Sequence, residues 1–306
     1  MKNKGYSYPD HVTPADEGLT VAAFYSRRYP HSTEAEWRRR IEAGQVLLNG
    51  LPALPDGTLV RGDDLLYHRL PWDEPGAPAD FGVLFEDEDV LVLAKPSGLP
   101  VLPGGFFLEN TLLYRVRERF GPSSSPLHRL GRGTSGAILF TRNPRAARTL
   151  AKAMAERRIL KVYLALAAGT SMPDAFTVEA PIGPVPYRLP ATVNAYLPGG
   201  RPSTSHVRVL RRDSDRNASL LEVTIPTGRP HQIRIHLSFA GYPLVGDPLY
   251  QAGGLPRAGG LDDEWTTTPG ATGYLLHSWK IRFPHPTRGE DVEVVCPPPA
   301  SLDPGS

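Results

Sequence analysis

The stretch "HRLGRGTSGAILF", His128 to Phe140, joins a glycine-rich basic loop to an apolar segment that we expect to be a buried strand. Backbone amides of such a loop, with the side chains of Arg129 and Arg132, can hold a phosphate. The loop contains neither a carboxylate nor a cysteine. It matches neither the P-loop nor the dinucleotide-binding fingerprint. Composition alone therefore predicts an anion-binding cleft at the start of a strand.

A serine in the same loop raises a hydrolase alternative. Ser135 is not part of a Gly-x-Ser-x-Gly motif, which is the usual setting of a hydrolase nucleophile on a strand-to-helix turn. A pair formed by Ser135 and His128 would also need an orienting acid, and none lies nearby in the sequence. The sequence therefore disfavours this alternative.

Length and composition limit the class of protein. The chain has 306 residues, of which 40% are hydrophobic, so it can form one large domain or two smaller ones. Its net charge of +2 does not by itself indicate a nucleic-acid partner. The single cysteine, Cys296, excludes an internal disulfide. The polar N-terminus and the lack of a long apolar run predict a soluble, cytoplasmic protein with no membrane span, and we expect a monomer.

The N-terminal section, residues 1–70, has the pattern of a small α+β unit. "STEAEWRRRIEAGQVLLNG" predicts a helix capped by Ser32 or Thr33 and ended by Gly44. A short strand with an Asn-Gly turn follows it. Residues 71–80 are rich in proline and acid and read as a linker.

The remainder, residues 81–297, contains more predicted strands than helices, and the two do not alternate strictly. The clearest helix is "NPRAARTLAKAMAERRI", with a proline near its first turn. This pattern favours an α+β fold, with a mixed and mostly antiparallel sheet, over a doubly wound parallel sheet. We expect residues 298–306 to be a disordered tail.

The segment "HQIRIH", residues 231–236, alternates polar and apolar side chains and therefore predicts a strand. Ile233 and Ile235 would face one side, with Gln232, Arg234 and His236 on the other. This polar face is either simply solvated or, together with Arg229 and His231, the lining of a cleft for phosphates or bases. A metal site is disfavoured, because the two histidines would lie on opposite faces of an ideal strand.

A second strand, "KVYLALAAG", places Lys161 and Tyr163 on one face. These residues are either a basic edge beside a core tyrosine, or a cation and an aromatic ring that contact RNA backbone and base. Their spacing alone does not decide between the two.

Five motifs in order support one resemblance: "LFEDEDVLVLAKPSGLPVLPG", "HRLGRGTSGAILF", "KVYLALAAG", "GRPHQIRIHLSFAGYPLVGDPLY" and "LLHSWKIRFPHPTRGE". Together they resemble the RluA family of pseudouridine synthases over roughly residues 81–297. The first section resembles the S-four-like RNA-binding domain through "RRRIEAGQVLLNG" and "VRGDDLLYH".

This resemblance implies a central RNA-binding cleft and isomerisation of uridine to pseudouridine in rRNA or tRNA, with no cofactor and no metal. The target base would be flipped out of its stack to be reached. The family loop reads His-Arg-Leu-Asp, and its aspartate is the essential catalytic residue; Gly131 stands at that position here.

The resemblance also implies roles for other residues. Tyr163 would stack on the uracil and transfer a proton, while Arg234, or the nearby Arg229, would pair with the family aspartate. Ile233 and Leu276 would form an apolar wall, and Arg129 would assist base flipping. Further residues expected to contact RNA are Arg132, Lys161, Arg229, His231, Gln232, Arg38 and Arg39.

Glycine at position 131 leaves two functional hypotheses. Without the aspartate, Arg234 would be a partly buried cation that needs a replacement partner, either RNA phosphate or another acid. Asp247 is expected to be structural, so Glu109 is the candidate acid. The chain is then either an active synthase with a substitute group, or an RNA-binding or assembly protein that has lost catalysis.

Overall fold

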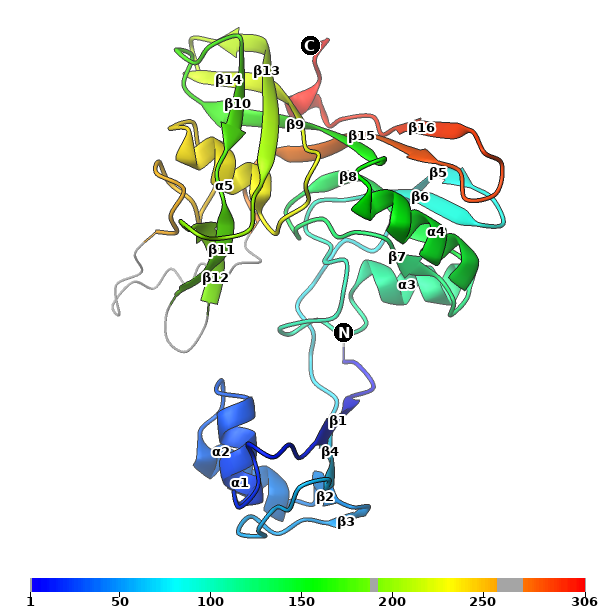
Figure 1. The fold of residues 1–306 in the computed structure, drawn as a ribbon, viewed down its shortest axis with the longest axis vertical. Helices are drawn as coiled ribbons and strands as arrows, with labels where there is room; N and C mark the ends of the chain where they lie inside the picture. The colour runs from blue at the N-terminus through cyan, green and yellow to red at the C-terminus, as the bar shows by residue number, and fades with distance from the viewer. Residues whose placement is uncertain (1, 188–191, 258–271, 306) are drawn as a thin grey trace. The chain divides into compact units, whose positions relative to one another are not determined.

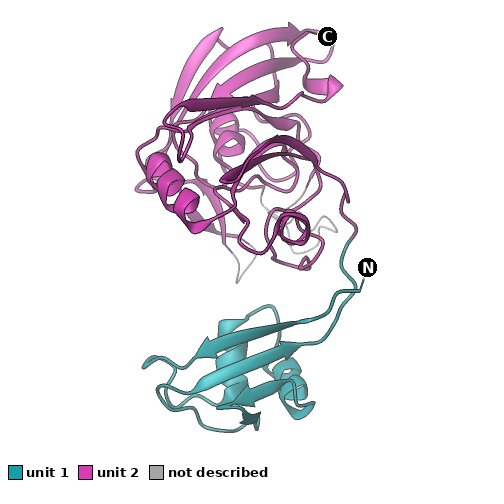
Figure 2. Cartoon of the chain, turned by 90° about the vertical axis from the view of Figure 1, so that its right-hand side faces the viewer, with its two compact units in different colours: residues 1–75 teal, residues 76–306 magenta. Residues whose placement is uncertain are grey.

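The computed structural model describes residues 2–187, 192–257 and 272–305. The chain divides into two compact units, residues 1–75 and residues 76–306 (Figure 2). The division falls inside the proline-rich segment 71–80. Each unit has its own apolar core, so each is described separately.

Unit 1 contains the helix that the sequence predicts, α2 (Glu34–Glu42). Thr33 is its N-cap: its hydroxyl accepts a hydrogen bond from the backbone of Glu36, whose carboxylate accepts one from the backbone of Thr33. This reciprocal arrangement satisfies amides that the first helical turn leaves without partners. Gly44, at a φ of +74°, follows the helix and lets the chain turn into the next strand.

The sheet of unit 1 has the strand order β1-β4-β2-β3 and is antiparallel. The predicted Asn49-Gly50 turn joins β2 to β3, and both residues have positive φ. An aromatic core that includes Tyr25 and Trp37 lies between sheet and helices. The remaining elements are β1 (Tyr6–His11), α1 (Val21–Arg28), β2 (Val46–Leu48), β3 (Leu51–Pro52) and β4 (Asp64–Arg69).

Unit 2 is built on a ten-stranded mixed sheet (Figure 1), which confirms the predicted α+β class. The order is β10-β13-β14-β9-β15-β8-β6-β5, with β16 paired to β15 and β7 to β8. Of the strand pairs within the described ranges, only β15 with β8 is parallel. The strands are β5 (Gly82–Glu86), β6 (Val90–Lys95), β7 (Ser125–Pro126), β8 (Ser135–Thr141), β9 (Leu160–Ala168), β10 (Ala175–Glu179), β13 (Thr204–Asp213), β14 (Ala218–Thr224), β15 (Leu276–Pro284) and β16 (Asp291–Val295), and a separate hairpin pairs β11 (Ile182–Pro186) with β12 (Thr192–Tyr196).

Part of this sheet is buried on both faces. In β6, Leu91 and Leu93 enter one apolar cluster, while Val90 and Val92 enter the cluster on the opposite face. This explains why "VLVLA" is a continuous apolar run rather than an alternating one. On the second face, α4 (Pro144–Ala155) packs against β8 and β15, and Leu150 and Ala153 of the helix enter that cluster. The first face is covered by α3 (Leu112–Phe120), through Leu112 and Val116.

The prediction of a strand over residues 231–236 is wrong. These residues begin α5 (Gln232–Phe239), which follows His231 at a φ of +58° and packs against β10, β12 and β13. Gln232 through Ser238 are all buried, so the polar side chains do not face solvent. Each has a hydrogen-bond partner outside α5, for example Ser205 and Ala180 for His236. The alternation therefore reflects buried polar contacts and not a strand with one solvated face.

The C-terminal segment also departs from expectation, since residues 300–302 form a short 3₁₀ helix (Ala300–Leu302) instead of a disordered tail. Leu302 is buried with Leu164 and Leu220, on the central strands β9 and β14. No helix in the described part of the chain is long and apolar enough to span a membrane.

Candidate active site

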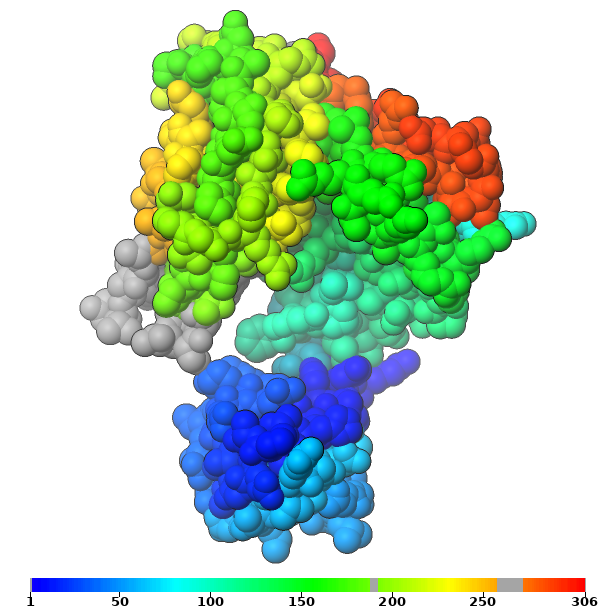
Figure 3. Space-filling model, viewed as in Figure 1, coloured from blue at the N-terminus to red at the C-terminus, as the bar shows by residue number. Residues whose placement is uncertain are grey.

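A pocket lies where the centre of the large sheet meets α5. The neighbouring strands β9, β15 and β8 bring three distant segments together, because Ser278 pairs with Tyr163 and His277 pairs with Ser135. The surface of unit 2 is indented between the yellow-green segments around β13 and the green-to-teal segments around α3 and α4 (Figure 3). The pocket is lined by Arg129, Leu130, Gly131, Thr134, Tyr163, Ile225, Arg229, His231, Gln232, Ile233, Arg234, Tyr274 and Leu276.

The loop that carries Gly131 is fixed by a buried lysine. The Lys95 ammonium donates hydrogen bonds to the carbonyls of Pro96, Leu99 and Arg132, at 2.8, 2.7 and 3.2 Å. Burial, with a smaller effect from the charge of Arg132, lowers the pKa of Lys95 to about 7. Arg132 itself donates to the Gly98 carbonyl and is not among the lining residues. The structure thus uses Arg132, which we expected to contact RNA, to join two loops.

Gly131 lies against a tyrosine that the sequence analysis did not single out. The hydroxyl of Tyr274 would be 2.7 Å from a Cβ placed on Gly131, and the hydroxyl of Thr134 would be 3.4 Å away. The φ of Gly131 is not in the left-handed region, so space and not backbone conformation restricts this position. Tyr274 is 3% exposed, and its hydroxyl lies 3.2 Å from that of Thr134. A larger residue at 131 therefore requires Tyr274 to move.

Arg234 already has an acidic partner within the protein. The expectation that this arginine needs a replacement acid is therefore wrong, although one of its three guanidinium nitrogens is not engaged by any described residue. Its Nε and Nη2 donate to the carboxylate of Asp247, both at 2.7 Å. The same carboxylate accepts the backbone N–H groups of Leu249 and Tyr250. Both side chains of the ion pair are almost completely buried. Nη1 is also buried, and no described residue accepts a hydrogen bond from it.

The ring of Tyr274 covers the Arg234 guanidinium, with 4.1 Å between the guanidinium carbon and the ring centroid. Tyr250 lies at 5.0 Å from the same carbon. Burial alone would lower the pKa of Arg234, but the hydrogen bonds to Asp247, together with the charge of Asp247 and the nearby Tyr274 and Tyr250, outweigh that effect and raise it. Arg234 is therefore a permanent cation between an acid and an aromatic ring.

Tyr163 occupies another side of the pocket. It projects from β9, is buried, and makes a side-chain hydrogen bond with Ser278. Burial raises the pKa of Tyr163 to about 12, so its phenol is protonated at neutral pH. Ile233 and Leu276 line the pocket with Ile225 and give it an apolar side. A planar ring of the size of a base could contact this surface.

Two residues at the start of α5 have their polar atoms engaged by the protein. The Gln232 amide accepts from Thr227 and from the backbone of Arg229, and donates to Thr204 and Ser205. Gln232 thus holds the turn before α5 to β13, although we expected it to contact RNA.

His231 is bonded to the Tyr250 hydroxyl at 2.9 Å through Nδ1. That hydroxyl donates its proton to the Asn194 carbonyl. The imidazole therefore donates from Nδ1, which leaves Nε2 as an acceptor. Burial, with the charge of Arg234, lowers the pKa of His231 to about 3 and keeps the ring neutral.

Other predicted residues lie outside the pocket. Lys161 is buried beneath the turn at Gly228, 3.9 Å from the Met154 sulfur, and burial lowers its pKa to about 8. Glu109, the candidate acid, is buried near the start of α3 and is not among the lining residues. Arg38 and Arg39 belong to unit 1, where Arg38 pairs with Glu34 and Asp56, and Arg39 is exposed.

The hydrolase alternative paired Ser135 with His128, but in the structure Ser135 is paired with a different histidine. Ser135 bonds to His277, at 2.9 Å, whereas His128 accepts from the backbone of Leu139. The second ring nitrogen of His277 is bonded to the Cys296 carbonyl and not to a carboxylate. This pair therefore lacks the orienting acid of a hydrolase triad.

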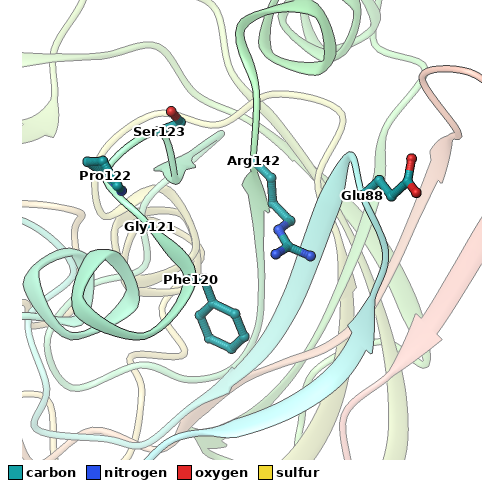
Figure 4. A pocket seen from close by; sticks show the side chains of 6 residues that line it. All are labelled: Glu88, Phe120, Gly121, Pro122, Ser123 and Arg142. Carbon is teal, nitrogen blue, oxygen red and sulfur yellow. The ribbon is translucent and has the colours of Figure 1, made fainter.

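A second hollow, lined by Glu88, Phe120, Gly121, Pro122, Ser123 and Arg142, is shown in Figure 4. Arg142 already donates to the Glu86 carboxylate and the Asp87 carbonyl, so its charge is engaged. Within the described ranges, no three His, Cys, Asp or Glu side chains are grouped so that they could hold a metal ion. The pocket at Gly131 is therefore the candidate active site.

Comparison with known proteins shows the family to which the chain belongs. Residues 89–239 match the family model described as RNA pseudouridylate synthase. RNA pseudouridine synthase 5 of Arabidopsis thaliana is 38% identical over 98% of this chain and 94% of its own length. Ribosomal large subunit pseudouridine synthase D of Neisseria meningitidis serogroup B is 32% identical over 90% of this chain and 73% of its own.

Among solved structures, that of human RNA Pseudouridylate Synthase Domain Containing 1 has a TM-score of 0.56 and 28% identity, covering 76% of this chain and 89% of that one. The chain therefore belongs to the RluA-type RNA pseudouridine synthases, the isomerases that convert uridine in RNA to pseudouridine.

Proposed function

We propose that the pocket at Gly131 receives a uridine flipped out of a structured RNA. The observation that carries this proposal is that Tyr163, Arg234 and the Gly131 loop, far apart in the sequence, line one pocket. The apolar side formed by Ile233 and Leu276 suits the faces of a uracil ring. Arg129 is exposed beside the pocket and can contact the phosphates of the flipped nucleotide.

We further propose that the RNA is that of the large ribosomal subunit. Relatives from Neisseria meningitidis and Xanthomonas campestris carry the name ribosomal large subunit pseudouridine synthase D. Unit 1, which resembles an S-four-like domain, would add RNA contacts through exposed arginines such as Arg39. Binding through these cations would weaken as salt concentration rises.

A second candidate function follows from Gly131. None of the described residues that line the pocket carries a carboxylate. A chain that keeps the pocket without a group able to act on the sugar would bind RNA and not modify it. Such a protein would serve in RNA folding or ribosome assembly.

Release of tritium from C5 of labelled uridine distinguishes these candidates. Transcripts of large-subunit rRNA and of tRNA, each labelled at C5, would be incubated with the wild-type chain and with Tyr163→Phe. We expect release from the rRNA transcript by the wild-type chain only. Binding of rRNA without release would favour the assembly function, and release from tRNA alone would contradict the rRNA assignment.

A further inference from the structure

The pocket poses a chemical problem that rests on the proposed function. To move uracil from N1 to C5, the bond between N1 and the sugar carbon C1′ must break. Enzymes assist bond breakage at such a carbon with a nucleophile or base next to the sugar. Of the lining residues that the structure describes, none is an acid, and those with a hydroxyl are Thr134, Tyr163 and Tyr274.

Geometry separates the three hydroxyls. Tyr163 is hydrogen-bonded to Ser278, on the strand that pairs with β9. Thr134 carries an aliphatic alcohol, which is a weaker leaving group than a phenol when a sugar bond must break again. The Tyr274 hydroxyl lies next to Gly131, 2.7 Å from where a Cβ would begin. Glycine at this position is what leaves room for the phenol.

A cation and a hydroxyl lie in fixed positions beside Tyr274. The Arg234 guanidinium lies against the ring at 4.1 Å, and Asp247 holds that guanidinium with two hydrogen bonds. The Thr134 hydroxyl, at 3.2 Å, can donate to a phenol oxygen that becomes negative. A buried cation and a donor in fixed positions need little rearrangement during a reaction.

We infer that Tyr274 is the catalytic nucleophile of this chain. Its oxygen bonds to C1′ as the N1–C1′ bond breaks, the electron pair of that bond leaves on N1, and the phenol proton moves to the released uracil. After the uracil rotates, C5 attacks C1′ and the O–C1′ bond breaks, returning its electron pair to the phenol oxygen. The proton lost from C5 then restores the phenol, so the isomerisation consumes no proton, electron or other reactant.

The same geometry gives Arg234 a second use. Its Nη1 is buried and has no described acceptor. This nitrogen can donate to an oxygen of the bound nucleotide, or to a carboxylate introduced at position 131. The role of the pocket can therefore be tested by removing the Tyr274 phenol and introducing a carboxylate at position 131.

The test compares single-turnover tritium release by wild type, Tyr274→Phe and Tyr242→Phe, on the RNA that the wild-type chain modifies. Tyr242 is a half-buried tyrosine of the same unit that does not line the pocket. We expect Tyr274→Phe to lose release by on the order of 10³-fold or more, as removal of a nucleophile does. Its RNA dissociation constant, measured by filter binding, should stay close to that of wild type, and Tyr242→Phe should keep both values.

A double variant guards against a simple loss of folding. Tyr274→Phe removes the oxygen that lies 2.7 Å from the Cβ position and leaves the ring carbon at 4.0 Å. Gly131→Asp combined with Tyr274→Phe should therefore recover release, whereas Gly131→Asp alone should not exceed wild type. Retention of more than a tenth of the wild-type rate by Tyr274→Phe would overturn the inference while the proposed function stands. Silence of the wild-type chain, with release by the double variant, would overturn both.

Discussion

Arg234, which was expected to pair with the family aspartate, and Arg38, which was expected to contact RNA, show that burial determines what a charged side chain can do. Arg234, in unit 2, pairs with Asp247, and these side chains are 2% and 1% exposed. Arg38, in unit 1, pairs with Asp56 at a similar distance, but the two side chains are 37% and 74% exposed. Water and salt weaken the second pair and hardly reach the first. The buried pair can therefore shape a pocket, whereas the exposed one can exchange its partner for a phosphate.

The largest expected effect comes from breaking the buried pair. Asp247→Ala would leave Arg234 buried without its acid and would also remove the acceptor for two backbone amides. We expect the free energy of unfolding of unit 2 to fall by about 3–5 kcal/mol, measured by urea titration. The matched control is Asp291→Ala, whose pair with Arg282 is about half exposed and should cost less than about 1 kcal/mol. Equal costs for the two variants would contradict the comparison.

Lys95 extends the comparison of buried and exposed charges to a buried cation whose partners are neutral carbonyl groups. Lys95→Met keeps the shape of the side chain but leaves three carbonyls without their donor. We expect a loss of about 2–4 kcal/mol in the same urea titration. Lys152→Met, at an exposed lysine of α4, is the control and should stay within about 0.5 kcal/mol of wild type.

A buried histidine makes stability depend on pH. The folded chain holds His231 neutral to about pH 3, whereas an unfolded histidine binds a proton below about pH 6.5. Between these values the unfolded state binds more protons, so stability falls as pH falls from 6.5 toward 3. When the pH falls from 7 to 5, the free energy of unfolding of His231→Asn should decrease by about 1–2 kcal/mol less than that of wild type. Urea unfolding at each pH measures this difference.

The smallest expected effects are on the exposed arginines. Arg39 is exposed and lacks the two carboxylate partners of Arg38. If unit 1 binds RNA, Arg39→Ala should weaken binding about two- to threefold and lower the slope of affinity against salt by about one unit. Arg38→Ala should have less effect, because Glu34 and Asp56 already compete for its charge. A larger effect at Arg38 would show that RNA displaces those acids.

Local signals predicted part of this structure well. The cap at Thr33, the Asn49-Gly50 turn and the strand after the glycine-rich loop depend on residues a few positions apart, and all three are present. The strand predicted over residues 231–236 is wrong, because alternation of polar and apolar residues indicates a strand only when the polar side chains face water. Here Gln232, Arg234 and His236 have buried partners between 13 and 56 residues away in sequence.

Motifs along the chain were sufficient to predict the class of the fold, the RNA pseudouridine synthase family and the glycine at position 131 of the central loop. The ion pair between Asp247 and Arg234 and the approach of Tyr274 to Gly131 are evident only in the folded chain. Tyr274 meets Thr134 across 140 residues of chain, through the pairing of β15 with β8. Contacts of this kind depend on strand register and on the packing of side chains in a shared interior, which no short motif specifies.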